Sequence, residues 1–191
     1  SAPGGDPLLD TATVVAGSGA WGLVAIPFVG TPDATAWAFM LVSVGIHWAY
    51  YITLAHAYRT GDLSFAYPLM RGTAPLLVTL LGVLFLRELP PALVMVGILL
   101  ICAGIVGIAF AQRQRHPRAA TAWALANAAI IAVYTLVDGA GARASGNALS
   151  YVLWLTFVEG IVFLLWIGQR YRDRAPRYIG AQWQRGMLSG F

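Results

Sequence analysis

Two apolar runs separated by a short polar turn constrain the fold of this chain more than any other feature. They cover residues 64–86 and 91–111, and the turn between them reads Arg87-Glu88-Leu89-Pro90. Each run is about 20 residues long, which is the length that an α-helix needs to cross the hydrocarbon core of a bilayer. A soluble fold of this size could not bury several such segments, so the sequence predicts an integral membrane protein.

Four further apolar runs support the same prediction. They lie at residues 9–29, 34–58, 119–142 and 149–167. Hydrophobic residues make up 59% of the 191 residues and charged residues only 10%, which is outside the balance of soluble domains. We therefore expect an all-α fold, a polytopic bundle of transmembrane helices with six complete spans. The basic and aromatic segment 169–185 is expected to lie at the membrane surface.

The charged residues indicate how the chain crosses the membrane. All twelve basic residues are arginines. If the spans alternate in direction, nine arginines lie on one side, two on the other and one inside the membrane. The two groups are Arg59, Arg113, Arg115, Arg118, Arg170, Arg172, Arg174, Arg177 and Arg185, and Arg87 and Arg143. The positive-inside rule places the larger group in the cytoplasm and the Arg87-Glu88 turn outside. The basic charge thus reflects topology, and we expect no nucleic-acid partner.

The sequence lacks the residues that several classes of chemistry require. Without lysine, the chain has no phosphate-binding-loop lysine and no Schiff-base lysine. The single cysteine, Cys102, cannot form an intrachain disulfide. His47 and His56 are nine residues apart, on nearly opposite faces of a helix, which does not favour a shared metal site. No nucleophile and base are paired in the sequence, so we expect no enzyme, no cofactor and no metal.

An arginine interrupts the first of the two opening runs. Arg71 lies next to Gly72 and between Pro68 and Pro75. An arginine near the centre of a membrane helix costs roughly 2.5–3.5 kcal/mol, which a neighbouring group must offset. Tyr67, Arg71 and Pro75 share one helical face, and Pro75 leaves the Arg71 carbonyl without its helical amide partner. We expect Tyr67 and Arg71 to bind substrate, and Pro68, Gly72 and Pro75 to form cavity backbone. Alternatively, Arg71 snorkels or pairs with a carboxylate only to join two helices.

Other polar residues within the runs are candidates for the same site. His47, Tyr50 and Tyr51 lie on one stripe of the second run, where they would bind substrate, although an aromatic stripe is also typical of packing. Asp138 is an acid within the fifth run, and Glu159 is an acid within the sixth. Each is a candidate for pairing with the intramembrane arginine or for carrying a proton, and Asp138 also suits a role at a helix end.

Small residues predict close helix packing in two of the runs. The first run contains the patch Gly17-Ser18-Gly19-Ala20. The run at 91–111 repeats small residues at Gly97 and Gly104 and at Ala103, Gly107 and Ala111. We expect the faces of this run to pack against other helices and the run as a whole to brace the span that carries Arg71.

Together these motifs resemble a known family. The features are a stretch of small residues and tyrosines, a mid-span proline, an arginine-glutamate turn and a glycine-marked span that follows. They are residues 57–68 (AYRTGDLSFAYP), Arg71-Gly72, Ala74-Pro75-Leu76, Arg87-Glu88, Gly97 and Ala103-Gly104. This pattern resembles the end of the EamA domain in the drug/metabolite transporter (DMT) superfamily. The family has a glycine-glutamate-arginine turn where this chain has Arg87-Glu88-Leu89. Tyr134, Asp138-Gly139 and Gly141 look like the opening of a second EamA repeat.

The resemblance implies a partial ten-helix fold of two inverted five-helix repeats around a central substrate cavity. Residues 1–111 would be the first repeat without its first helix, residues 112–118 a basic connector, and residues 119–191 the start of a second repeat that lacks about three helices. Family members with cytoplasmic termini would place the connector outside, whereas the arginine count places it inside. We follow the arginine count for this chain.

The function expected from these features is secondary active transport. The chain would act as a permease or exporter of small metabolites, such as amino acids or related polar solutes, by alternating access in the bacterial cytoplasmic (inner) membrane. Its partners would be the lipid bilayer and a small-molecule substrate. Transport could be coupled to protons, and the chain could form a homodimer. The alternatives are a polyspecific exporter of drugs or aromatic compounds, which the tyrosine stripe favours, and a membrane scaffold that transports nothing.

Overall fold

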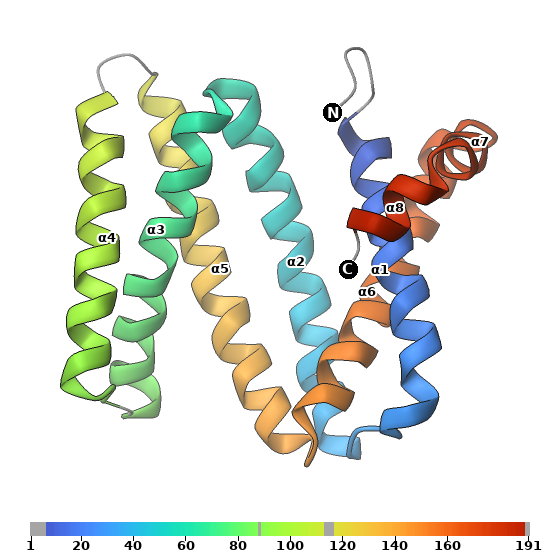
Figure 1. The fold of residues 1–191 in the computed structure, drawn as a ribbon, viewed down its shortest axis with the longest axis horizontal. Coiled ribbons are helices and arrows are strands. Elements are labelled where there is room, and N and C mark those ends of the chain that lie inside the picture. The colour runs from blue at the N-terminus through green and yellow to red at the C-terminus, as the bar shows by residue number, and fades with distance from the viewer. Residues whose placement is uncertain (1–6, 88, 113–116, 190–191) are drawn as a thin grey trace. The chain divides into compact units, whose positions relative to one another are not determined.

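The computed structural model describes residues 7–87, 89–112 and 117–189, which form helices and no strand (Figure 1). The elements are α1 (Pro7–Val29), α2 (Ala34–Thr60), α3 (Leu63–Leu81), a short π-helical segment η1 (Gly82–Leu86), α4 (Ala92–Gln112), α5 (Arg118–Ala144), α6 (Ala148–Tyr171), α7 (Arg174–Ala181) and α8 (Trp183–Ser189). Glu88 of the predicted turn and residues 113–116 of the predicted connector lie outside the described residues.

Six helices, α1 to α6, are long and apolar enough to cross a membrane. They coincide with the six predicted spans, so the prediction of an all-α bundle of membrane-crossing helices is confirmed at this level. Large apolar side chains such as Leu93 and Leu100 on α4 are 84% and 69% exposed. Exposing this much apolar surface to water would be unfavourable, whereas lipid chains can cover it. The chain is a multi-pass membrane protein.

Helix α3 runs without interruption through both of its prolines. Pro68 and Pro75 each remove one backbone donor from the helix. The hydroxyl of Thr79 donates to the Pro75 carbonyl at 2.8 Å, so this side-chain donor is satisfied within the apolar span. The helix continues into η1 and ends at Arg87, whose backbone is left-handed with φ 56°.

The chain divides into two compact units, which are described separately below. Residues 41–140 form one unit, which contains most of α2, all of α3, η1 and α4, and most of α5. Residues 1–40 and 141–191 form the other, which contains α1, α6, α7 and α8. The predicted repeat boundaries at residues 111 and 119 stay a prediction.

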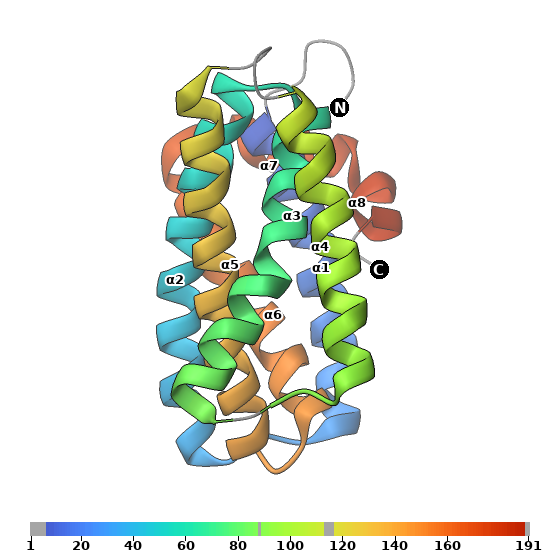
Figure 2. The ribbon, with the colours of Figure 1, turned by 90° about the vertical axis from the view of Figure 1, so that its left-hand side faces the viewer.

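The core of the 41–140 unit lies where α2, α3 and α5 meet. Its largest buried side chains are Phe65, Leu69 and Met70 of α3. Alanines of α2 and α5 complete it, including Ala57, Ala120, Ala124 and Ala128. Figure 2 shows α3 between α4 and α5. Because alanine brings backbones close together, this core is held by tight helix contact as well as by apolar area.

Helix α4 packs against α3, as expected for a bracing span. Its contact residues differ from those that the small-residue pattern predicted. Cys102 lies against Leu76 of α3, and Ile105 lies where α3 has Gly72. Gly97, Gly104 and Gly107 have open space around them, so the prediction that they pack against a helix is wrong within this chain. Periodic small residues mark a face that permits close approach, but they do not identify the partner helix.

The other unit is built on α1 and α6, which run antiparallel side by side (Figures 1 and 2). Ser150 and Trp154 of α6 both donate to the Gly30 carbonyl after α1, at 2.9 and 3.0 Å. Trp154 also meets Trp37 edge to face at 5.3 Å. These contacts fix the sharp turn at Gly30, whose φ of +72° suits glycine.

Helix α8 packs on α1 through glycine and tryptophan. The Trp21 indole donates to the Met187 carbonyl at 3.0 Å. A Cβ added at Gly17 would meet the backbone of Gly186, whereas Gly19 has nothing within 4 Å. The predicted small-residue patch is therefore a contact surface at Gly17, whereas a Cβ at Gly19 would have room.

Replacing Gly17 with alanine is expected to destabilise the packing of α8 on α1. The added methyl group meets backbone, which cannot rotate away, and the cost is about 1 kcal/mol because a short helix can shift as a body. The free energy of unfolding in detergent measures it. Gly19→Ala, two residues away on the same helix, is the control and should leave this free energy unchanged or higher. Equal effects of the two substitutions would contradict the described contact.

Candidate functional site

Aromatic side chains of α2 and α5 meet in the 41–140 unit. His47 stacks on Tyr134 with ring centroids 4.3 Å apart and planes 30° apart. Tyr50 meets Tyr134 edge to face at 6.0 Å and Tyr51 at 5.3 Å. These four residues, His47, Tyr50, Tyr51 and Tyr134, are called the aromatic cluster below. All four are half-buried, so the cluster combines packing with partial access.

Hydrogen bonds orient the imidazole of His47. Its Nδ1 lies 3.0 Å from the Ser43 carbonyl oxygen and 3.3 Å from the Ser43 hydroxyl. With the proton on Nδ1, the ring donates to that carbonyl and Nε2 becomes the acceptor. A neutral His47 held in this way can accept a hydrogen bond from a substrate or receive a proton.

A buried amide of α5 holds α2 in place beside the cluster. The side-chain nitrogen of Asn127 donates to the Tyr50 carbonyl at 3.0 Å and to the Thr53 hydroxyl at 2.9 Å. Asn127 is fully buried and lies two helical turns from Tyr134, on the same face of α5. Because a polar group inside a membrane helix seeks a polar partner, these bonds fix the register of α2 against α5.

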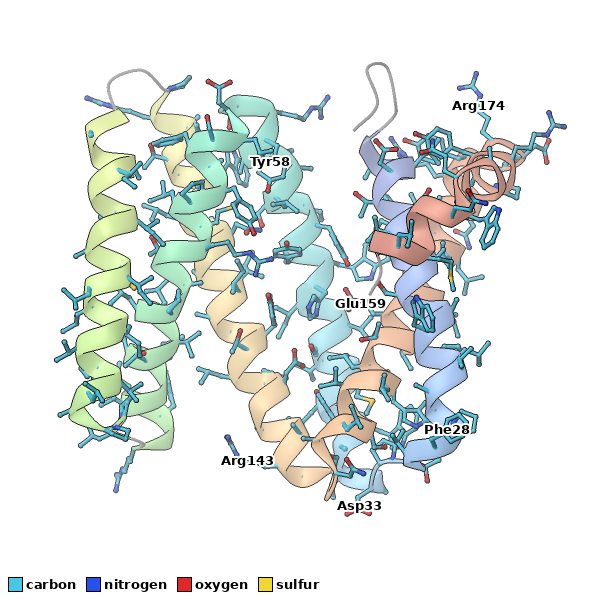
Figure 3. The ribbon with its side chains drawn as sticks, viewed as in Figure 1. Phe28, Asp33, Tyr58, Arg143, Glu159 and Arg174 are labelled. Carbon is cyan, nitrogen blue, oxygen red and sulfur yellow. The ribbon has the colours of Figure 1, made fainter. Side chains whose placement is uncertain are left out.

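Arg71 extends the polar surface along α3. Its guanidinium carbon lies 5.8 Å from the centroid of the Tyr67 ring, in a cation–π arrangement, and both side chains are exposed. Tyr58 of α2 lies within electrostatic range of Tyr50, Tyr67 and Arg71. Figure 3 shows Tyr58 near the end of α2 that leads into α3. We call Tyr58, Tyr67 and Arg71 the arginine cluster.

Tyr50 connects the two clusters. Its ring contacts those of the aromatic cluster, and it is also an electrostatic neighbour of Tyr58. The described unit therefore brings together the predicted residues His47, Tyr50, Tyr51, Tyr67 and Arg71. These residues lie on α2 and α3, and Tyr134 adds α5 to the group. The group offers a cation, phenol hydroxyls, aromatic faces and an imidazole to a bound molecule.

Pro68, Gly72 and Pro75 of α3 were predicted to form the backbone of a cavity. Gly72 is buried and faces Ile105 of α4. Pro68 and Pro75 are half-buried within the continuous helix. Their role in lining a cavity stays a prediction. What Gly72 does in the structure is to let α4 approach α3 closely.

The two intramembrane acids belong to different units. Asp138 is half-buried on α5, four residues after Tyr134, and so on the same side of that helix. Glu159 is half-buried on α6 beside the buried Gly160, whose close neighbours are Gly19 and Val15 of α1. Both acids have interaction partners in the structure. Pairing of either acid with Arg71 stays a prediction.

Sequence reasoning missed two members of this surface and one anchor. Tyr134, Tyr58 and Asn127 were visible as polar or aromatic residues in apolar runs but were not predicted to bind substrate. A signal was available, because Asn127, Tyr134 and Asp138 are spaced seven and four apart and form one polar stripe of α5. A polar stripe on one membrane helix is expected to face polar groups of a neighbouring helix. In this structure the facing polar and aromatic residues are on α2.

Among the residues that the structure describes, no three His, Cys, Asp or Glu side chains gather as metal ligands would. Comparison with known proteins gives no assignment: no family model, no characterised protein and no solved structure matches the chain. The functional argument therefore rests on the side chains themselves.

Proposed function

We propose that the chain is part of a secondary transporter for small polar metabolites that works by alternating access. Membership of the EamA and DMT group, with its ten-helix inverted-repeat fold, belongs to this proposal and rests on the sequence resemblance. Location in the bacterial cytoplasmic membrane rests on the same resemblance. The observation that carries the proposal is Arg71, an exposed cation in a membrane helix beside Tyr67.

Arg71 supports transport because a charge inside the membrane needs a polar environment. Cations in membrane helices face a bundle interior or a water-filled pathway, and they commonly mark substrate routes. A purely structural arginine would be expected in a buried ion pair, whereas the described contact of Arg71 is the face of the Tyr67 ring. A scaffold protein would gain nothing from the desolvation cost of such a residue.

The two clusters suit a zwitterion such as an amino acid. A guanidinium binds a carboxylate through two parallel hydrogen bonds, which is the role of Arg71. The faces of Tyr50, Tyr51 and Tyr134 attract an ammonium group through their quadrupoles. Tyr50 joins the two clusters, so both ends of a small solute would find a partner. Asp138 and Glu159 are the groups that would carry a coupled proton.

A second candidate is export of aromatic or cationic compounds. The stack of His47 on Tyr134 and the edge contacts of Tyr50 favour flat, apolar ligands. Such a ligand would depend on the aromatic cluster and not on Arg71. Loss of transport in Tyr51→Ala together with full transport in Arg71→Ala would select this candidate.

Reconstitution of the full-length protein in liposomes tests the proposal. We expect counterflow of radiolabelled amino acids into liposomes preloaded with unlabelled amino acids, above the level of protein-free liposomes. A panel of neutral, acidic and aromatic amino acids identifies the preferred class. Absence of flux for the whole panel and for organic cations would contradict transport and favour the scaffold alternative.

A further inference from the structure

Four arginines surround the junction between α6 and α7. Arg170 is in the last turn of α6, Arg172 follows this helix, and Arg174 and Arg177 are on α7; all four are exposed. Figure 3 shows the Arg174 side chain extending away from the helices. Asp173 is the one acidic residue between positions 169 and 185. This surface, called the arginine platform below, therefore carries a clear excess of positive charge.

The platform lies where a membrane-crossing helix ends. Helix α6 is a span that closes at Tyr171. Arg172 then takes a backbone with φ 42° and ψ −118°, which non-glycine residues rarely adopt. The chain turns sharply there, and α7 lies crosswise to α1 and α6, so that Figure 1 shows it nearly end-on. A helix that lies crosswise at the end of a span occupies the depth of the lipid headgroups.

Contacts with α1 decide which face of α7 points outward. Ala175 is buried, and the Tyr178 hydroxyl donates to an Asp10 carboxylate oxygen at 2.6 Å. Positions 175 and 178 share a face because they are three residues apart. Arg174 flanks this face one turn before Tyr178, Arg177 lies further round the helix, and both arginines are exposed. The hydrogen bond to Asp10 holds this orientation. Trp183, 58% exposed at the start of α8, provides an interfacial anchor nearby in the chain.

We propose that the arginine platform binds the phosphate groups of anionic phospholipids in the surrounding leaflet. Guanidinium groups bind phosphate oxygens in a fork geometry, and anionic lipid is the phosphate source that the bilayer itself presents at this depth. The positive-inside rule places this side of the chain toward the cytoplasm, where the leaflet carries negative surface potential. The proposal is independent of transport, because it concerns residues outside both clusters.

Native mass spectrometry of the full chain in detergent, titrated with dioleoyl phosphatidylglycerol or dioleoyl phosphatidylcholine, tests the proposal. We expect the first phosphatidylglycerol to bind more tightly than phosphatidylcholine. Each arginine removed should weaken it by about five-fold, so R174Q/R177Q should weaken it by roughly 25-fold. R174K/R177K keeps the charge and should lose much less, which shows that the fold is intact.

Two controls decide between the outcomes. Arg143→Gln removes an arginine from the other side of the chain and should leave phosphatidylglycerol binding unchanged. Inorganic phosphate at equal concentration should not compete, because the platform is built for a headgroup anchored in lipid. Equal binding of the two lipids, unchanged binding in R174Q/R177Q or full competition by free phosphate would each overturn the proposal.

Discussion

Arg71→Ala is expected to weaken the apparent affinity of the transporter for an anionic or zwitterionic solute by about 30-fold or more. Truncating one member of a desolvated charge pair costs at least about 2 kcal/mol, since the partner charge is left without its counterpart. Here the partner would be the substrate carboxylate. The measurement is the solute concentration that gives half-maximal counterflow in liposomes.

Two variants separate this role from a general effect of lost charge. Arg71→Lys keeps the charge but loses the planar fork, so its affinity should lie between those of the native protein and Arg71→Ala. Arg143→Ala, which removes an arginine near the end of α5, should leave the half-maximal concentration unchanged. A half-maximal concentration in Arg71→Ala equal to that of the native protein would show that Arg71 holds helices together and does not bind substrate.

Gly72→Ala is expected to lower the free energy of unfolding by about 2–3 kcal/mol. The added Cβ of residue 72 would meet the Cβ, Cγ2 and Cδ1 atoms of Ile105 on α4. Helix α3 cannot yield easily, because Leu69, Met70 and Ala74 are fixed in the core of the same unit. Unfolding by titration with a denaturing detergent measures the change.

Removal of the obstructing side chain should restore much of this stability. In the double variant Gly72→Ala with Ile105→Ala the methyl group has room, so the combined loss should be smaller than the sum of the single losses by about 0.5–3 kcal/mol. Gly104→Ala, next to Ile105 but with open space around it, is the matched control and should not destabilise the chain. Additive losses would mean that α3 and α4 do not meet at Gly72.

The number and extent of the membrane helices followed from the sequence because the requirement is local. An apolar run of about 20 residues has one favourable state in a bilayer, whatever its neighbours are. The runs at 34–58 and 149–167 accordingly correspond to α2 (Ala34–Thr60) and α6 (Ala148–Tyr171). The stripe of His47, Tyr50 and Tyr51 could be predicted for the same reason, since it depends only on helical periodicity.

The partners of these helices could not be predicted in the same way. Contact between His47 and Tyr134 joins residues far apart in the sequence, and no periodicity specifies which stripe of α5 faces α2. Small residues misled for α4, because Gly104 and Gly107 offer close approach to any helix, whereas α3 is met by Cys102 and Ile105. The face that a helix packs depends on all the contacts that compete for it. Each contact needs residues from two helices, so the sequence of one span does not specify it.

Reaction of engineered cysteines with a charged reagent tests most directly whether the arginine cluster lines a watery pathway. Tyr67 on α3 and Leu99 on α4 have nearly equal exposed fractions, 49% and 51%, so geometry alone gives their side chains the same access. The account predicts that Tyr67 faces water within the bundle and Leu99 faces lipid. Only a thiol in water ionises readily and meets a charged reagent.

The measurement uses the full-length protein in liposomes with Cys102→Ala as background and a membrane-impermeant, positively charged thiosulfonate as reagent. We expect Tyr67→Cys to react quickly and to be protected by transported solute, and Leu99→Cys to react slowly with no protection. Equal slow reaction of both cysteines would place Tyr67 and its neighbour Arg71 outside any aqueous pathway and would contradict the proposed site.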